Sequence, residues 1–126
     1  MKQENRKKGA FGENLAIKYL KKQKYKIICS NYTNFIGEID IIAKDKKCLV
    51  FVEVKSRSTL EFGRPSEAVD ENKQNKIREI ATYYLKQNKL FDSPCRFDVI
   101  EVLGEEINHI PNAFWRIFPK NEIYKT

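Results

Sequence analysis

Long hydrophobic stretches, repeats and low-complexity segments are absent from this sequence of 126 residues. No apolar run approaches the about 18 residues that a membrane-spanning helix needs, so we expect neither a membrane span nor a membrane partner. Residues 1–8 are basic, and they lead into residues 9–13 without the apolar core of a signal peptide. These absences predict a soluble, cytoplasmic protein.

Cysteine and histidine are also scarce. Cys29, Cys48 and Cys95 are odd in number and widely spaced, with no Cys-x-x-Cys pair, so neither a disulfide framework nor a zinc site is indicated. His109 is the only histidine, and no serine or cysteine stands at an informative spacing from it. We therefore expect no nucleophilic triad.

The composition is that of a globular protein, with 41% apolar and 33% charged residues. At this length we expect a single domain over residues 1–126, in which residues 1–8 form a flexible basic N-terminal segment. The net charge is +7, and lysines and arginines that neutralise phosphates release counterions on binding. Nucleic acid is therefore the expected partner, although lysine-rich surfaces are also often simply solvated.

Acidic residues and a lysine interrupt two neighbouring apolar runs, residues 37–43 and 49–57. Such short runs predict two strands, and the segment between them has the length of a hairpin connection. Because side chains alternate between the two faces of a strand, Glu38, Asp40 and Ile42 should share one face. The two strands should pair antiparallel.

On the second of these strands, Glu53 and Lys55 share a face, so Asp40 can meet both of them across the hairpin. Two explanations fit this pattern. In the first, Glu53 and Lys55 form a structural ion pair while Asp40 is solvated at a sheet edge. In the second, Asp40 and Glu53 hold Mg²⁺ for phosphodiester hydrolysis, and Lys55 orients or activates the attacking water.

Periodicity and turn residues predict the remaining elements. They are a helix over 11–22, a strand over 25–29, a turn region over 30–36, a loop over 58–64, a helix ending near Lys89, a strand over 95–103 and a short apolar run over 107–110. The predicted fold is a single α/β domain with a mixed sheet of four or five strands flanked by helices.

Several side chains outside the hairpin can serve a site. Glu13 borders the apolar stripe of the first helix. There it either interacts favourably with the helix dipole, as an acid in the first turn does, or reaches the sheet. Arg57 and Arg64 flank the 58–64 loop, and they either grip a phosphate backbone or are solvated. Asp98 lies among apolar residues, where it supplements the acidic site, supports Arg96 or supports a helix end.

Two aromatic residues in the second helix leave a similar choice. Tyr83 and Tyr84 either stack on bases, or Tyr84 packs in the core and Tyr83 is partly exposed.

An acid, a hydrophobic hairpin and then Glu-x-Lys resemble the PD-(D/E)XK nuclease core. The wider set of motifs resembles the YraN-like family of small bacterial proteins, and it comprises Gly9-x-x-Gly12-Glu13, Asn31-Tyr32, Gly37-Glu38-Ile39-Asp40, Phe51-Val52-Glu53-Val54-Lys55-x-Arg57, Phe62-Gly63-x-Pro65, Lys73-Gln74, Arg96-Phe97-Asp98-Val99 and Asn112-Ala113-Phe114. The resemblance covers nearly the whole chain. It implies a restriction-endonuclease-like fold related to Holliday-junction resolvases and tRNA-splicing endonucleases, with nucleic acid as ligand. As the partner we expect DNA rather than RNA.

The resemblance also implies roles for individual residues. Asp40 and Glu53 become ligands of Mg²⁺ or Mn²⁺, with Glu13 as a third ligand and Glu38 in a supporting position at the rim, and Lys55 assists the attacking water. Lys73 and Gln74, by analogy, help to position the scissile phosphate, although an exposed helix end explains them as well. Resolvase-like enzymes act as symmetric dimers, so a homodimer is one expectation.

We therefore expect a metal-dependent endonuclease acting on DNA or structured nucleic acid. Two alternatives remain. One is a non-catalytic module that binds nucleic acid with a nuclease-like fold, and the other is an interaction protein whose positive charge only keeps it in solution.

Overall fold

The computed structural model describes the backbone of residues 2–57 and 69–114, with side chains from residue 10 onward. The elements are α1 (Lys2–Lys22), β1 (Lys26–Thr33), β2 (Glu38–Asp45), β3 (Cys48–Arg57), α2 (Glu71–Gln87), β4 (Cys95–Leu103) and β5 (Glu106–Phe114). This order confirms the predicted α/β fold, with its helix, three strands, second helix and two further strands. It is the arrangement expected of a single restriction-endonuclease-like domain. No helix in the described ranges is both long and apolar enough to cross a membrane.

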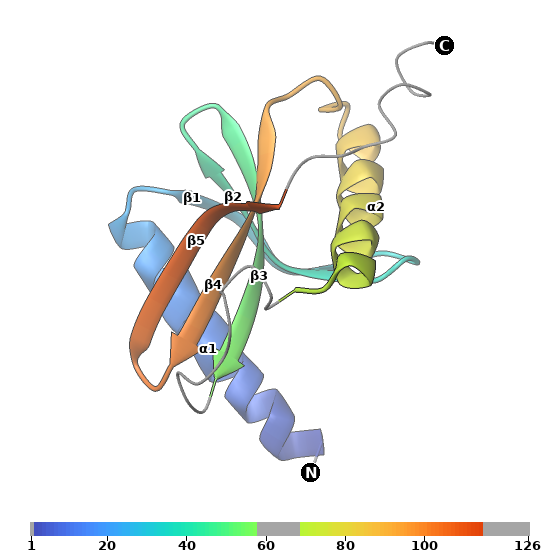
Figure 1. The fold of residues 1–126 in the computed structure, drawn as a ribbon. Helices are drawn as coiled ribbons and strands as arrows, with labels where there is room; N and C mark the ends of the chain where they lie inside the picture. The colour runs from blue at the N-terminus through green and yellow to red at the C-terminus, as the bar shows by residue number, and fades with distance from the viewer. Residues whose placement is uncertain (1, 58–68, 115–126) are drawn as a thin grey trace.

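The five strands form one sheet in the order β1-β2-β3-β4-β5 (Figure 1). β3 and β4 run parallel, and the other neighbours pair antiparallel. Parallel neighbours need a long crossover, and the stretch that contains α2 supplies it between β3 and β4. A two-residue turn at Lys46 and Lys47 joins β2 to β3, and Lys46 adopts a positive φ of 57° there. The predicted mixed sheet is confirmed.

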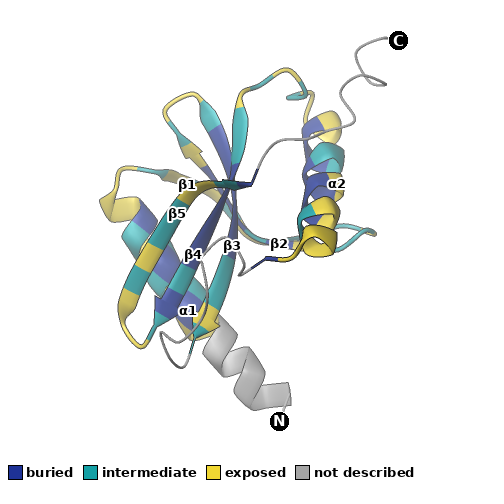
Figure 2. Ribbon diagram, in the orientation of Figure 1, coloured by how far each residue is buried: buried dark blue, intermediate teal, exposed yellow. Residues whose placement is uncertain are grey.

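The sheet is covered by one helix on each face, which gives two apolar layers (Figure 2). Between the sheet and α2, Phe51 stacks on Phe97, which stacks on Phe114, with ring centroids 5.5 and 5.0 Å apart. Between the sheet and α1, Ala16 and Leu20 pack on the opposite face of β2, β3 and β4. The central strands are thus buried on both sides, which explains their nearly continuous apolar sequence.

Several element boundaries differ from those that the sequence predicted. α1 begins at Lys2 rather than near Phe11, because apolar periodicity marks only the part of a helix that packs on the core. β1 continues to Thr33 through the predicted turn region, because residues as far as Thr33 pair with β2. Polar residues in an edge strand give little sequence signal, so this extension depends on tertiary pairing.

Candidate metal site where β2 and β3 separate

The site forms at the point where β2 and β3 diverge. Paired residues of the two strands run from Asp45 and Cys48 at the turn to Ile41 and Val52. Beyond them, Oδ2 of Asp40 accepts a hydrogen bond from the backbone N–H of Val54, with 2.8 Å between the two atoms. The carboxylate therefore takes the place of a backbone acceptor and is anchored between the strands.

Asp40 also marks an interruption in the alternation of β2. Ile39 and Ile42 pack in the apolar layer under α2, whereas Ile41 packs in the layer under α1. Strict alternation would place Ile39 with Ile41, so the shared face predicted for Glu38, Asp40 and Ile42 is not maintained through Asp40. As a result, Asp40 interacts electrostatically with groups on both sides of the sheet.

The pKa of Asp40 is raised from 3.8 to about 7. Burial is the largest cause, followed by the negative charge of Glu53, and the N–H of Val54 opposes the rise. Glu53 itself is buried, with 8% of its side chain exposed. Two carboxylates held together in this way favour either a shared proton or a bound cation.

Two lysines contact the same oxygen of Glu53. Nζ of Lys55, on β3, and Nζ of Lys73, on α2, each lie 3.6 Å from Oε2 of Glu53. Lys73 is placed by the start of α2, where the Asp70 side chain accepts a hydrogen bond from the Lys73 N–H at 2.8 Å. Lys55 and Lys73 therefore converge on the carboxylate pair from two different elements.

Both explanations of the hairpin acids can be compared with this geometry. The Glu53–Lys55 ion pair of the structural explanation is present. Asp40, however, is not solvated at a sheet edge, because it is half-buried on an interior strand and hydrogen-bonded to Val54. The Glu53–Lys55 ion pair therefore provides no counter-charge from the described residues for the half-buried carboxylate of Asp40.

Glu13 and Glu38 lie beside this pair. Burial raises the pKa of Glu13, and the charges of Asp40 and Glu38 raise it further, whereas a hydrogen bond with Asn31 lowers it. Glu38 is exposed and accepts a hydrogen bond from the Thr33 hydroxyl at 3.3 Å. The acids named from the sequence therefore influence one another at this end of the sheet.

Helix α1 reaches the site because Gly12 has no side chain. A Cβ at Gly12 would lie 2.6 Å from Oγ of Ser56 and 3.8 Å from Cγ1 of Val54. This close approach brings Glu13, the next residue, to the ends of β2 and β3.

Within residues 10–57 and 69–114, no group of three or more Asp, Glu, His or Cys side chains is arranged to hold a metal ion. The carboxylates that are brought together are Asp40 and Glu53. Mg²⁺ usually keeps several waters and binds through one or two carboxylates plus substrate phosphate. The raised pKa of Asp40 and the oxygen-only donors fit a hard divalent cation held in this way.

The residues named for contact with nucleic acid are placed differently from one another. Nε of Arg57 lies 3.4 Å from Oε2 of Glu101 on β4. The Gln74 side chain donates to the carbonyl of Val69 at 2.9 Å and so helps to fix the start of α2. Arg64 lies outside the described residues. Of the three that the structure describes, Lys73 is the one that contacts the acidic pair.

A second polar cluster, which we had not expected as a unit, lies under α1. Asp98 is fully buried and accepts hydrogen bonds from Arg96 at 3.0 Å and from the Asn112 N–H at 2.9 Å, and its Oδ2 lies 2.7 Å from Nε2 of His109. Nδ1 of His109 lies 3.1 Å from the Tyr19 hydroxyl on α1. Asp98 therefore pairs with Arg96, one of the roles predicted for it, and links α1, β4 and β5. The sequence features that point to this cluster are the single histidine, His109, and an acid, Asp98, within an apolar strand. The contact between the two residues depends on the register of β4 and β5, which the sequence does not reveal.

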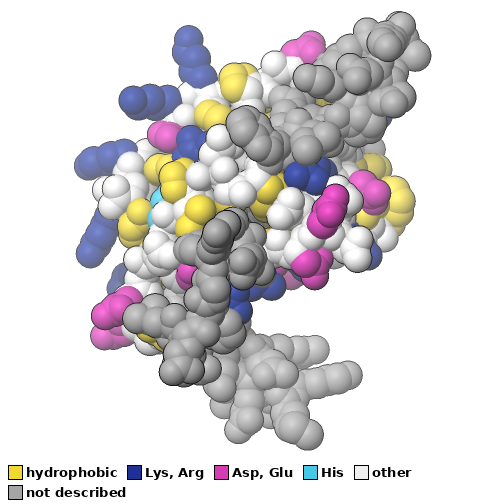
Figure 3. All heavy atoms as spheres, viewed as in Figure 1, with side chains coloured by type: hydrophobic (Ala, Val, Ile, Leu, Met, Phe, Trp, Pro, Cys, Tyr) yellow, Lys and Arg dark blue, Asp and Glu magenta, His cyan; other side chains and the backbone are white. Residues whose placement is uncertain are grey.

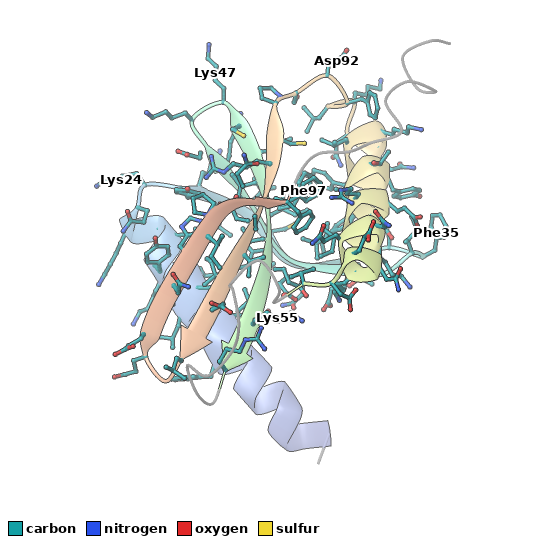
Figure 4. All side chains as sticks on the ribbon, in the orientation of Figure 1. Lys24, Phe35, Lys47, Lys55, Asp92 and Phe97 are labelled. Atoms are coloured by element: carbon teal, nitrogen blue, oxygen red, sulfur yellow. The ribbon has the colours of Figure 1, made fainter. Side chains whose placement is uncertain are left out.

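On the face shown in Figure 3, lysine and arginine side chains line the edge where Figure 4 labels Lys24 and Lys47, whereas Lys55 lies at the far end of β3. Among the described residues, Lys55 and Lys73 are the cations that contact the acidic pair.

Most of the chain is similar in sequence to bacterial proteins of one family. A family model described as "Uncharacterised protein family UPF0102" matches residues 12–102. The chain is 53% identical over 112 residues to a UPF0102 protein of Clostridioides difficile, covering 87% of this chain and 98% of that protein. It is 48% identical over 122 residues to a UPF0102 protein of Caldanaerobacter subterraneus, covering 90% and 100% respectively. These matches support the YraN-like resemblance of the motifs, and the chain belongs to the UPF0102 family.

Proposed function

We propose that this protein is a Mg²⁺- or Mn²⁺-dependent endonuclease that hydrolyses phosphodiester bonds of DNA or structured nucleic acid. The observation that carries the proposal is the Asp40–Glu53 carboxylate pair, in which the pKa of Asp40 is raised to about 7 and two lysines contact Glu53. Buried acids without full compensation are costly to the fold, and such sites are candidates for function.

In this proposal Asp40 and Glu53 hold the cation, and Glu13 and Glu38 add negative charge around it. When bound, the cation polarises the phosphoryl group and lowers the pKa of a coordinated water. Lys55 lies on the same strand as Glu53 and 3.6 Å from its carboxylate, where it orients the attacking water and stabilises the charge that develops on the phosphate. Lys73 supplies a second positive charge from α2.

The substrate class follows from the same groups. A phosphate approaching the acidic pair needs a cation between the like charges and basic side chains beside it, and Lys55, Lys73 and the net charge of +7 provide the latter. The resemblance of the Asp40 to Lys55 segment to the PD-(D/E)XK core supports the same reaction. A dimer of the protein would present two such sites to two strands.

The test is cleavage of labelled duplex, single-stranded, flapped and four-way-junction DNA and of RNA, with Mg²⁺ or Mn²⁺, by the wild type and by Glu53→Gln. The matched control is Glu105→Gln, which changes an exposed glutamate in the β4–β5 turn. We expect metal-dependent products from the wild type and the control but not from Glu53→Gln.

Equal products from the wild type and Glu53→Gln would overturn the proposal and indicate a contaminating nuclease. Binding without products would favour the non-catalytic module, and the salt dependence of that binding would measure its phosphate contacts.

A further inference from the structure

Phe35 stands at the tip of the β1–β2 connection with 82% of its surface exposed. The tip is fixed by Asn34, whose N–H donates to the carbonyl of Gly37 at 2.9 Å and whose side-chain oxygen accepts from the Ile36 N–H at 2.9 Å. Ile36 packs against the apolar layer under α2. Phe35 is therefore held outward by a hydrogen-bonded turn while its neighbour turns inward.

The tip rests on α2. A Cβ at Gly37 would lie 3.0 Å from Cδ1 of Ile80, and the Asn34 side chain approaches the Ile80 carbonyl at 3.5 Å. The rings of Phe35 and Tyr83 meet edge to face, with centroids 5.1 Å apart and an interplanar angle of 82°. Figure 4 shows Phe35 beyond α2, on the side of that helix away from the sheet. The exposed ring of Phe35 and the half-buried ring of Tyr83 thus form an aromatic pair built from segments far apart in the chain.

Two lysines of α2, Lys76 and Lys73, lie between this aromatic pair and the carboxylate site. Lys76 lies one turn before Ile80 on α2, and its Cε is 3.7 Å from the position of a Cβ at Gly37. Lys73 lies one turn further toward the start of the helix and contacts Glu53. At 1.5 Å of rise per residue, Tyr83 is about 15 Å from Lys73 along the axis of α2. One side of α2 therefore carries, in order, Tyr83 of the aromatic pair, then Lys76, then Lys73. Lys73 in turn contacts the acidic pair.

We propose that Phe35 and Tyr83 form a stacking platform for an unpaired base of a single-stranded nucleic-acid segment that leads to the carboxylate pair. This inference rests on the proposed function and specifies its substrate class as nucleic acid with unpaired bases. Single-strand sites combine basic side chains along the backbone with aromatic rings that accept any base. An apolar protein partner would not account for the lysines between the rings and the acids.

The spacing gives the platform a defined distance from the reaction. Stacked nucleotides of one strand rise by about 3.4 Å each, so about 15 Å corresponds to roughly four nucleotides between the stacked base and the phosphate at Lys73. Glu79 is exposed one turn before Tyr83 and repels phosphate. The strand is therefore expected to pass on the side of α2 that carries Lys76.

The test measures binding without any divalent cation, so that cleavage does not enter. Fluorescence anisotropy at low salt compares a labelled oligothymidylate with a duplex of the same length. The variants are Phe35→Ala, Tyr83→Ala and Phe35→Trp, with Phe11→Ala as the matched control because Phe11 is 54% exposed and lies on α1, the helix on the opposite face of the sheet.

We expect Phe35→Ala and Tyr83→Ala each to weaken single-strand binding by about tenfold and duplex binding by less than about twofold. Phe35→Trp keeps a ring and should retain wild-type affinity, and Phe11→Ala should leave it unchanged. Unfolding of these variants is followed by circular dichroism, and Phe35→Trp controls for any loss of structure at the tip.

Equal single-strand affinity of the wild type and Phe35→Ala, equal losses for duplex and single strand, or no single-strand binding by the wild type would each overturn the platform. The proposed reaction is judged separately. Tenfold weaker binding by Phe35→Ala in a protein that never cleaves keeps the platform and overturns the nuclease. Cleavage that needs Glu53 and proceeds on single strands at the same rate in Phe35→Ala keeps the nuclease and overturns the platform.

Discussion

The Oδ2 atom of Asp40 lies 2.8 Å from the backbone nitrogen of Val54 and accepts its hydrogen bond. A side chain thereby replaces the backbone partner that Val54 would have if β2 and β3 continued to pair. The same hydrogen bond therefore accompanies the separation of β2 from β3 and fixes the position of the Asp40 carboxylate. A neutral side chain that keeps a hydrogen-bond acceptor at residue 40 should therefore preserve the local fold while removing the negative charge of Asp40.

Asp40→Asn tests the cost of that charge. Because the pKa of Asp40 is raised to about 7, its contribution to stability is fully present below about pH 4 and is lost as the pH rises through about 7. In metal-free buffer we expect Asp40→Asn to raise the free energy of unfolding by about 2 kcal/mol near pH 8, and to change it little near pH 4. Urea denaturation at both pH values measures this.

The same variant should lose metal-dependent cleavage and metal affinity, because an amide is a weaker ligand than a carboxylate for a hard cation. Isothermal titration with Mn²⁺ gives the affinity, and Glu105→Gln is the control. Unchanged Mn²⁺ affinity in Asp40→Asn would count against Asp40 as a ligand. A destabilisation of the same size at both pH values would contradict the buried-charge explanation.

Lys55 and Lys73 share the Oε2 atom of Glu53 but should contribute differently. Lys55→Met should lower kcat by about a hundredfold or more while Mn²⁺ affinity is maintained, because the role proposed for Lys55 is to stabilise the transition state rather than to hold the metal. Lys73→Met, which removes the more exposed lysine, should lower kcat by about tenfold or less. Single-turnover cleavage of the preferred substrate compares the two, and equal losses would remove the distinction between them.

Asp98→Asn should destabilise the protein without affecting the chemistry of the site. Burial alone would raise the pKa of Asp98, but hydrogen bonds from His109, Arg96 and the Asn112 N–H outweigh it and hold the pKa below 3.8. Its contribution is therefore present above about pH 4 and is lost as the pH falls below that value. We expect Asp98→Asn to cost about 3 kcal/mol near pH 7, measured by urea denaturation.

Asp45→Asn is the control for this cluster, because Asp45 contacts the same arginine at 3.2 Å but is 31% exposed at its side chain. Its loss should cost less than about 1 kcal/mol. An Asp98→Asn variant as stable as Asp45→Asn would show that the buried network contributes little.

Gly12→Ala should destabilise the protein even though alanine favours helix by about 1 kcal/mol over glycine. The added Cβ would lie 2.6 Å from Oγ of Ser56, so either the Ser56 side chain rotates or α1 moves away from β3. We expect a net loss of about 1–2 kcal/mol together with weaker cleavage, because Glu13 moves with the helix. The double variant Gly12→Ala/Ser56→Ala removes the clashing hydroxyl and should recover most of the lost stability and most of the lost cleavage activity. If neither is recovered, the contact with the Ser56 hydroxyl is not the cause of the loss.

Sequence patterns were most informative where a strand is bounded by turn residues. The predicted strand over 95–103 coincides with β4, because Pro94 and Gly104 delimit an apolar alternating run. The meeting of Asp40 and Glu53 also followed from the sequence, since two adjacent strands joined by a short turn must pair antiparallel. Boundaries failed where polar residues continue an element, as in β1 up to Thr33.

The sequence by itself determined the order of elements and the acidic hairpin, because local periodicity and turn chemistry specify strands and their nearest pairing. Only the tertiary structure decided that Lys73 contacts Glu53, that Phe35 stands beside Tyr83, and that His109 contacts Asp98. Each of these contacts joins separate elements. Their positions depend on how the helices pack against the two faces of the sheet and on β-strand register, which no local pattern of residues encodes.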